Sequence, residues 1–334
     1  MGRIARRAFL KVAGTAGLAL ATGCGARPSP ADDAARLPQA PAEIVVTPTG
    51  ELYTQSYDAV PAVDLAQWSL TVDGLVQRPR SLGYAEVLAY PKRTALRTLE
   101  CIGNPAGGAL IGNPAWGGFD ALELWSQVGI LPQARRARFT AADGYQTSVE
   151  LEWITRQGTL LVHEINGEAL PERHGFPLRI LMPGLYGQKM PKWLTRVEFI
   201  DEPSLGYWES RGWSDVAAVK THSGIDRPVG LGLLPAAAVP VYGLAFAGLR
   251  RITRVEVRID DGEWQAAELL QADSPLVWTQ WSYVWRAAPG RHRLAVRAAD
   301  ESGFVQSTEA SAPHAGAFPD GTDAIHEVVV AVGG

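Results

Sequence analysis

One cysteine stands in a segment whose composition could support chemistry. Cys101 directly follows Glu100, and six glycines fall between residues 103 and 118. Glycines let the backbone approach a bulky group closely or adopt positive φ angles. A thiolate in this segment could act as a nucleophile or as a ligand for a soft metal. The alternative is that Cys101 packs as a small, inert hydrophobic residue.

A second segment, between residues 174 and 194, is basic and rich in glycine. It contains His174, Arg179, Lys189 and Lys192. Cationic side chains and exposed backbone N–H groups together form a cradle that suits a phosphate-bearing organic anion. An ordinary surface with scattered cations is the alternative. A soft thiolate combined with a phosphate cradle is what an anchored metal–pterin would need.

Several other kinds of chemistry are excluded by the sequence. It contains no Gly-rich nucleotide loop, Walker sequence, Gly-x-Ser-x-Gly elbow, zincin spacing or Cys-x-x-Cys-His haem motif. The formal net charge is −4, which gives no global electrostatic case for binding nucleic acid. Two cysteines cannot build a disulfide framework, a Cys₄ zinc site or an iron–sulfur cluster. Any redox reaction would therefore need a separate electron carrier or redox subunit.

The secondary-structure elements that must position these residues are predicted to be a mixture of strands and helices. Residues 68–72 alternate between apolar and polar and then reach Asp73-Gly74, which predicts a strand entering a turn. Residues 197–200 predict another strand. Asp120 can cap a helix with Leu122, Trp125 and Val128 on one face and with its end at Gly129. We therefore expect a mixed α+β domain over residues 46–224.

The pattern changes from about residue 225, where strand signals dominate. Residues 254–259, 291–297 and 328–332 predict strands, and Asp261-Gly262 supplies a hairpin turn. Residues 231–249 carry no charge, but two prolines in this stretch would break a membrane helix, so the stretch predicts an interdomain linker and a buried strand. The sequence predicts a β-sandwich over residues 225–334.

The N-terminal residues are predicted to form an export signal followed by a tether. Residues 1–24 combine Arg6-Arg7 with a short apolar run, which is typical of a twin-arginine export signal, with an ordinary secretory signal as the alternative. Cys24 ends a lipoprotein-like box and is either lipidated, giving a membrane anchor, or removed by plain cleavage. Residues 25–45 are rich in Pro and Ala and predict a tether. We expect a periplasmic protein.

Several motifs, in order, resemble the sulfite-oxidase family of molybdopterin enzymes. They are Glu-Cys-x-Gly-Asn at 100–104, His-Gly-x-Pro-x-Arg at 174–179, Lys-Trp-Leu at 192–194 and the run from Gly206 to Ser214. The resemblance implies a mixed α+β molybdopterin-binding domain followed by an immunoglobulin-like domain of the dimerisation type. It also implies a molybdenum–molybdopterin cofactor and a cytochrome-type electron partner.

The resemblance assigns roles to particular residues. Cys101 corresponds to the thiolate ligand of molybdenum. The expected cofactor-binding residues, from the matching positions and from the basic cradle, are Asn104, Asp143, His174, Arg179, Lys189 and Lys192. The protein would orient and tune the cofactor, whose metal carries out the oxygen-atom chemistry.

Three positions depart from the pattern of true sulfite oxidases. Gln55 stands at the position of an arginine that holds the sulfite anion, Tyr57 at the position of a histidine and His163 at the position of an active-site tyrosine. The missing arginine removes a charge-assisted hydrogen bond, which typically contributes about 1.5–3 kcal/mol. His163 could act as an acid or base near neutral pH or could be structural.

We therefore expect an exported oxidoreductase that performs a two-electron oxygen-atom transfer on a small substrate. It would be sulfite oxidase-like but not a typical sulfite oxidase, with Gln55, Tyr57, Cys101 and His163 at its catalytic site. The alternative is a non-catalytic exported binding or scaffold protein that keeps the cofactor fold.

Overall fold

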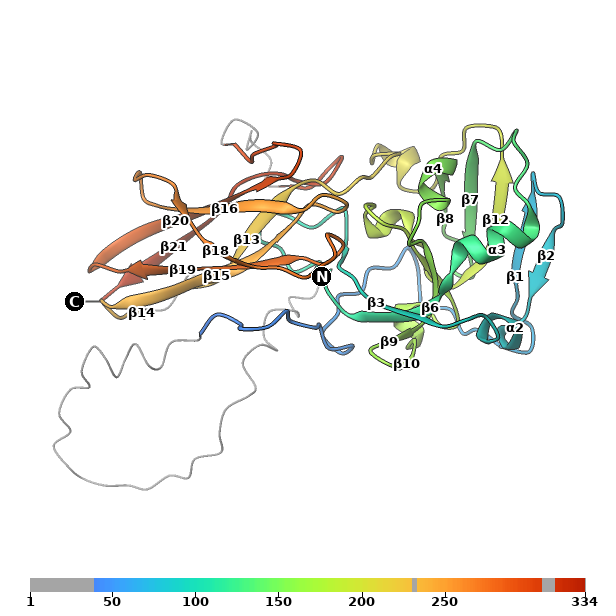
Figure 1. The fold of residues 1–334 in the computed structure, drawn as a ribbon, viewed down its shortest axis with the longest axis horizontal. Helices are drawn as coiled ribbons and strands as arrows, with labels where there is room; N and C mark the ends of the chain where they lie inside the picture. Colours follow the sequence, from blue (N-terminus) through green and yellow to red (C-terminus); the bar gives the residue numbers. More distant parts are fainter. Residues whose placement is uncertain (1–38, 230–232, 308–315, 334) are drawn as a thin grey trace, which may run out of the picture.

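The computed structural model describes residues 39–229, 233–307 and 316–333, and Figure 1 shows them as two bodies side by side. The predicted export signal, Cys24 and most of the predicted tether lie outside the described residues. The end of that tether packs against the protein, because the Val45 backbone N–H donates to Gln280 Oε1 at 2.6 Å. The chain is therefore fixed before residue 46, somewhat earlier than predicted.

The first domain contains two sheets and a short hairpin. One sheet has the order β2 (Arg80–Leu82), β1 (Leu70–Gly74), β12 (Leu194–Ile200), β7 (Arg136–Ala141) and β8 (Gln146–Glu150). The other has the order β10 (Glu168–Ala169), β9 (Leu160–Ile165), β6 (Ala115–Asp120) and β3 (Arg93–Leu96), with β11 (Arg179–Leu181) also paired to β9. The hairpin joins β4 (Leu99–Glu100) to β5 (Ile111–Gly112). The predicted strands at 68–72 and 197–200 correspond to β1 and β12, which pair in parallel.

The helices of this domain are few and short. They are α2 (Tyr84–Leu88), α3 (Ala121–Val128) and α4 (Leu151–Ile154), with the 3₁₀ turns η2 (Glu172–His174), η3 (Gly187–Lys189) and η4 (Glu209–Arg211). Helix α3 forms as predicted, because Asp120 caps it by accepting from the Leu122 N–H at 3.0 Å. It ends at Gly129, whose φ of 67° lies in the left-handed region.

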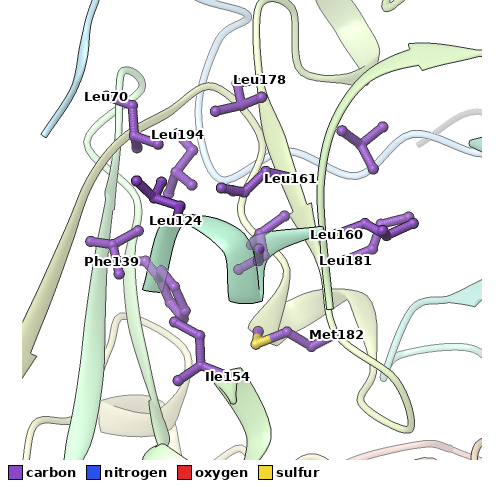
Figure 2. Packing of buried hydrophobic residues seen from close by; sticks show 14 of the residues in the cluster. Leu70, Leu124, Phe139, Ile154, Leu160, Leu161, Leu178, Leu181, Met182 and Leu194 are labelled. Carbon is purple, nitrogen blue, oxygen red and sulfur yellow. The ribbon is translucent and has the colours of Figure 1, made fainter. Parts of the chain in front are cut away.

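The buried face of α3 joins the core between the two sheets. Figure 2 shows Leu124 of α3 close to Phe139 of β7, Leu161 of β9 and Leu194 of β12. All four side chains are fully buried. Each contributes roughly 1.5–3 kcal/mol by leaving water, so this core fixes the sheets that carry the site.

The second domain consists of two sheets that share a core. One sheet has the order β13 (His222–Arg227), β15 (Ala238–Phe246), β19 (Thr279–Arg286) and β18 (Glu268–Leu270). The other has the order β14 (Leu233–Leu234), β21 (His326–Val332), β20 (Gly290–Asp300), β16 (Ile252–Ile259) and β17 (Gln265–Ala266). Strands β16, β20 and β21 cover the predicted strands, and Trp281 and Trp285 lie in the shared core.

Two boundaries in the second domain are refined by the structure. Strand β13 begins at His222 and pairs with β15, so this domain starts earlier than residue 225. The uncharged stretch 231–249 contains β14 and β15, which confirms the predicted buried strand. The predicted interdomain linker is wrong, because β13 precedes this stretch and already belongs to the second domain. Within the described residues, no helix has the length and apolar character needed to cross a membrane.

The two domains meet in a hydrogen-bonded and partly apolar seam. The Thr98 N–H donates to the Leu276 carbonyl at 2.9 Å, and Thr98 Oγ1 accepts from the Trp278 N–H at 2.8 Å. Ile102 belongs to one buried cluster with Trp278. The seam therefore reaches the segment that carries Cys101.

Candidate active site

A cavity of about 320 Å³ opens in the first domain, where several loops meet. The residues around it come from segment 53–57, β4, the loop between β4 and β5, the turn before β8, η2, β11, η3 and the segments 190–193 and 208–213. Seven of the predicted site residues line it, namely Gln55, Tyr57, Cys101, Asp143, His174, Arg179 and Lys192. Residues far apart in sequence thus form one site.

Cys101 lies at the start of the loop between β4 and β5. Its N–H donates to the Leu110 carbonyl at 2.9 Å and its carbonyl accepts from the Asn104 N–H at 2.9 Å, so the loop is closed at its base. The thiol is free and partly buried. Burial raises the pKa of this thiol above its usual value, while the Gly103 N–H partly offsets the effect. A metal ion would favour the thiolate, since a coordinating thiol is deprotonated.

Cationic groups form one wall of the cavity. Arg179 is 4% exposed, and its Nη1 donates to the His174 carbonyl at 3.2 Å. Its Nε has no hydrogen-bond partner within the described part of the chain. Lys192 Nζ donates to Ser56 Oγ at 2.9 Å and to the Arg173 carbonyl at 3.1 Å. The Nε of this buried guanidinium is therefore available to an anionic or acceptor ligand.

The electrostatics of this wall support the same conclusion. Burial, with Arg179 nearby, lowers the pKa of Lys192 to about 7. The same two causes lower the pKa of His174 to about 4, so its imidazole is neutral, and its Nε2 lies 3.2 Å from the Thr49 carbonyl. Asp143 is the sole carboxylate among the described residues that line the cavity. An anion in the cavity would relieve this excess of positive charge.

Aromatic side chains line much of the remaining surface, and the sequence reasoning did not single them out as a group. Besides Tyr57, they are Tyr53, Tyr145, Trp193, Trp208 and Trp213. Tyr53 is deeply placed, and burial together with the Cys101 charge raises its pKa well above the usual value, so its phenol is neutral. The matched run from Gly206 to Ser214 was the one sequence signal for Trp208 and Trp213. It gave no hint of the contact between Tyr57 and Tyr207, whose ring centroids lie 4.4 Å apart.

His163 does not line the cavity, which differs from its predicted role at the metal. It is 6% exposed on β9, with Nδ1 3.9 Å from Glu164 Oε1, and burial lowers its pKa. The cause is strand alternation. Val162 pairs with Arg179 across β9 and β11, and directly paired residues share a face, so His163 points to the opposite face.

Lys189 and Asn104 also lie outside the cavity lining, in contrast to their predicted contact with the cofactor. Lys189 is fully buried, and its Nζ lies 2.5 Å from Glu209 Oε1 and 3.2 Å from Asp215 Oδ1. Asn104 donates from Nδ2 to Glu100 Oε1 at 2.9 Å, and its Oδ1 accepts from the Leu110 N–H at 2.9 Å. Both side chains support segments that do line the cavity.

The two domains match two family models in the order described. Residues 57–208 match the oxidoreductase molybdopterin binding domain, and residues 215–316 match the Mo-co oxidoreductase dimerisation domain. Relatives include the sulfite oxidase of Arabidopsis thaliana, 29% identical over 68% of this chain and 70% of that protein. The uncharacterized oxidoreductase YuiH of Bacillus subtilis is 33% identical over 45% of this chain and 74% of that protein.

Further matches extend the comparison to other members and to a solved structure. The nitrate reductase of Aspergillus niger is 30% identical over 66% of this chain, which spans 32% of that protein. The structure of the sulfane dehydrogenase SoxCD from Paracoccus pantotrophus has a TM-score of 0.74 and 22% identity and covers 89% of this chain and 82% of that chain. The likeness extends over both domains and shows a shared fold.

The chain belongs to the sulfite-oxidase family of molybdopterin oxidoreductases. It is an enzyme of that class, and its cofactor is molybdenum–molybdopterin. The cavity fits this group, because a free thiol and an incompletely paired buried guanidinium line the same space.

Proposed function

We propose that this enzyme is an exported molybdenum oxidoreductase that transfers an oxygen atom to or from a small substrate of low charge, rather than a typical sulfite oxidase. The observation that carries the proposal is the meeting of the Cys101 thiol with the Arg179 guanidinium in one cavity. When bound, the cofactor supplies the two-electron oxygen-atom chemistry. The residues of this chain bind it, orient it and shape the space for the substrate.

Four residues would hold the cofactor. Cys101 would supply the thiolate ligand, and Arg179 and Lys192 would bind the anionic phosphate by charge-assisted hydrogen bonds. His174, held neutral, would offer a ring nitrogen for a neutral hydrogen bond to the pterin. Asp143 lines the same cavity, and burial raises its pKa, with Lys192 among the groups that offset the effect.

The lining of the cavity favours a substrate with little charge and some apolar surface. Gln55 offers an amide rather than a cation, and Tyr57 is an aromatic side chain that is 40% exposed. Trp213 lies close to the thiol, since a Cβ placed on Gly103 would lie 3.7 Å from Cys101 Sγ and 3.8 Å from the Trp213 ring. A sulfoxide, or another small oxo donor or acceptor, suits such surroundings better than a dianion.

Export and assembly complete the proposal. The twin-arginine-like start at residues 1–24 supports transport of the folded, cofactor-loaded protein to the periplasm, with Cys24 as a lipid anchor. The match of residues 215–316 to a dimerisation domain supports a homodimer. A separate cytochrome-type carrier or redox subunit would exchange electrons with the metal centre, since the sequence contains no Cys-x-x-Cys-His haem motif and too few cysteines for an iron–sulfur cluster.

The decisive experiment compares the wild-type chain with Cys101→Ala, both produced in a molybdenum-competent host. We expect the wild type to contain one molybdenum and one pterin per chain and to reduce a sulfoxide, or oxidise its thioether, faster than it oxidises sulfite. Cys101→Ala should keep the pterin and lose turnover. A wild-type protein without molybdenum, or an unchanged Cys101→Ala variant, would contradict the proposal.

The non-catalytic alternative makes the opposite prediction for the same proteins. A scaffold that merely keeps the fold would show no reduction or reoxidation of a metal centre with any small donor or acceptor. The shared cavity of Cys101, Arg179 and Lys192 favours the catalytic function, because a scaffold has no need of a buried guanidinium whose hydrogen bonding is incomplete.

A further inference from the structure

The loop that carries Cys101 is poorly supported by its own strands. Strands β4 and β5 contribute only the pairs Leu99↔Gly112 and Glu100↔Ile111, and the loop from residue 101 to 110 runs between them. Asn104 closes this loop internally by accepting from the Leu110 N–H at 2.9 Å. A metal ligand on such a loop needs further support if its position is to be fixed.

That support comes from the second domain through one buried carboxylate. Glu100 is 3% exposed, and its Oε1 accepts from Asn104 Nδ2 at 2.9 Å. Its other oxygen, Oε2, lies 2.9 Å from Nε2 of His222, the first residue of β13. His222 is itself 4% exposed. One carboxylate oxygen of Glu100 thus contacts the loop, and the other contacts the second domain.

A second contact holds the far end of the same loop. A Cβ placed on Gly107 would overlap the ring of His326 in β21, and a Cβ on Gly224 of β13 would lie 3.1 Å from Gly107 Cα. His326 is oriented by its Nδ1, which accepts from the Ile225 N–H at 3.0 Å. The loop therefore lies against two strands of the second domain at two separate points.

We propose that the second domain positions the molybdenum ligand, with His222 acting through Glu100 and Asn104 on the loop of Cys101. This inference rests on the proposed role of Cys101 and makes His222 a positioning residue, since it does not line the cavity. Residues that orient a metal ligand typically change metal affinity or activity by about 10–100-fold when they are removed. The dimerisation-type domain therefore has a role within its own chain.

The test uses His222→Leu, which fills similar space without a ring nitrogen, and Asn104→Ala, which removes the link from the loop side alone. The control is His292→Leu, because His292 also pairs with a carboxylate of the same domain, with Nδ1 2.8 Å from Asp260 Oδ2, in a more exposed position away from the loop. His222→Gln restores an amide donor. All variants are made in the full chain and judged folded by circular dichroism.

The first measurement is the rate at which a maleimide labels Cys101 in cofactor-free protein, with peptide mass mapping to separate it from Cys24. We expect His222→Leu and Asn104→Ala to label about tenfold faster than wild type, because local opening of the loop becomes easier. His292→Leu should match wild type, and His222→Gln should return toward it. Faster labelling in Asn104→Ala alone would overturn the proposal, as would equal rates in all variants.

The second measurement is made on cofactor-loaded protein and follows the Mo(V) electron paramagnetic resonance spectrum together with kcat. We expect His222→Leu to keep its pterin, to broaden or split the spectrum, and to lower kcat about 10–100-fold. A spectrum and kcat identical to those of wild type would overturn the proposal. If the wild type held no molybdenum, the proposed function would fail, whereas the labelling experiment would still decide whether His222 holds the loop.

Discussion

Two lysines that are three positions apart in the sequence lie in opposite surroundings. Lys189 is completely buried and lies between the carboxylates of Glu209 and Asp215, at 2.5 Å and 3.2 Å. Lys192 faces the cavity and has hydrogen bonds to a hydroxyl and a carbonyl but no ion pair among the described residues. The first cation is neutralised within the protein, and the second leaves its charge for a ligand.

The comparison shows that the role of a charged side chain depends on the groups it contacts rather than on its position in a sequence motif. Lys189 closes η3 and holds the segment of Glu209 beside the Trp208 and Trp213 turn. Lys192 and Arg179 line the cavity, where their charges are available to an anionic ligand. The expected consequences of substituting the two lysines are therefore opposite in kind.

The largest expected effect is on folding. Lys189→Met leaves the buried Glu209 carboxylate without its cation and should lower the free energy of unfolding by about 3–5 kcal/mol. Chemical denaturation of cofactor-free protein measures this change. Lys192→Met is the control and should leave the same quantity unchanged or raise it, since it removes a partly desolvated cation that has no ion pair. Equal losses in the two variants would abolish the distinction between the two lysines.

A smaller effect, on substrate affinity, is expected when a cation is added to the cavity at Gln55. Gln55→Arg would supply a charge-assisted hydrogen bond to an anionic substrate, about 1.5–3 kcal/mol, so the KM for sulfite should fall roughly 10–100-fold. The KM for an uncharged sulfoxide should stay the same or rise. Steady-state kinetics with both substrates measure the change. A drop in KM for both would mean that the substitution acts through the fold rather than through charge.

Removing the charge of Lys192, which has no ion pair among the described residues, should weaken binding of the cofactor. Lys192→Met is expected to lower the pterin content after extensive dialysis, with binding weakened roughly 10–100-fold, since a charge-assisted hydrogen bond contributes about 1.5–3 kcal/mol. Fluorescence of the released, oxidised pterin measures it. Lys92→Met serves as the control, because Lys92 pairs with Glu164 and does not line the cavity. The assignment of Lys192 fails if both variants keep wild-type content.

The smallest effect is a dependence of stability on pH. The pKa of Lys192 is about 7 in the folded, cofactor-free protein and 10.5 in the unfolded chain. Between these values the unfolded chain binds more protons, so stability should rise as pH increases from about 7 toward 10. We expect Tm to increase by a few degrees across this range and the increase to disappear in Lys192→Met. An anionic cofactor should also remove the increase, because it would favour the charged lysine.

Much of the fold could be predicted from local patterns. Helix α3 follows from the Asp120 cap and the Gly129 end, and β16, β20 and β21 follow from alternation. The pairing of β1 with β12 could not be predicted, since more than a hundred residues separate them in the chain and no local signal specifies the partner. The start of the second domain at His222 was missed because a strand buried among polar neighbours shows no alternation.

The site was predicted in part for related reasons. Motif positions identified Cys101, His174, Arg179 and Lys192, all of which line the cavity. His163 was misplaced because sequence gives no strand register, and a neighbouring residue on β9 faces the other side. Lys189 was misplaced because its partner Glu209 follows 20 residues later, so that no spacing rule links the two. Charge and motif positions in the sequence identify both lysines. Only the folded structure shows that Lys189 is paired with carboxylates and that Lys192 is available to a ligand.

The seam between the domains has a consequence for the order of events during synthesis. Glu100 meets a residue 122 positions later in the chain, and the loop tip at Gly107 packs against His326, close to the described C-terminal end. Contacts of such long sequence separation form late, since the chain entropy of closing them must be overcome first. The cavity that carries Cys101 is therefore expected to be completed only after the chain has emerged past His326. Binding of the cofactor would then require that both domains have folded and made their contacts.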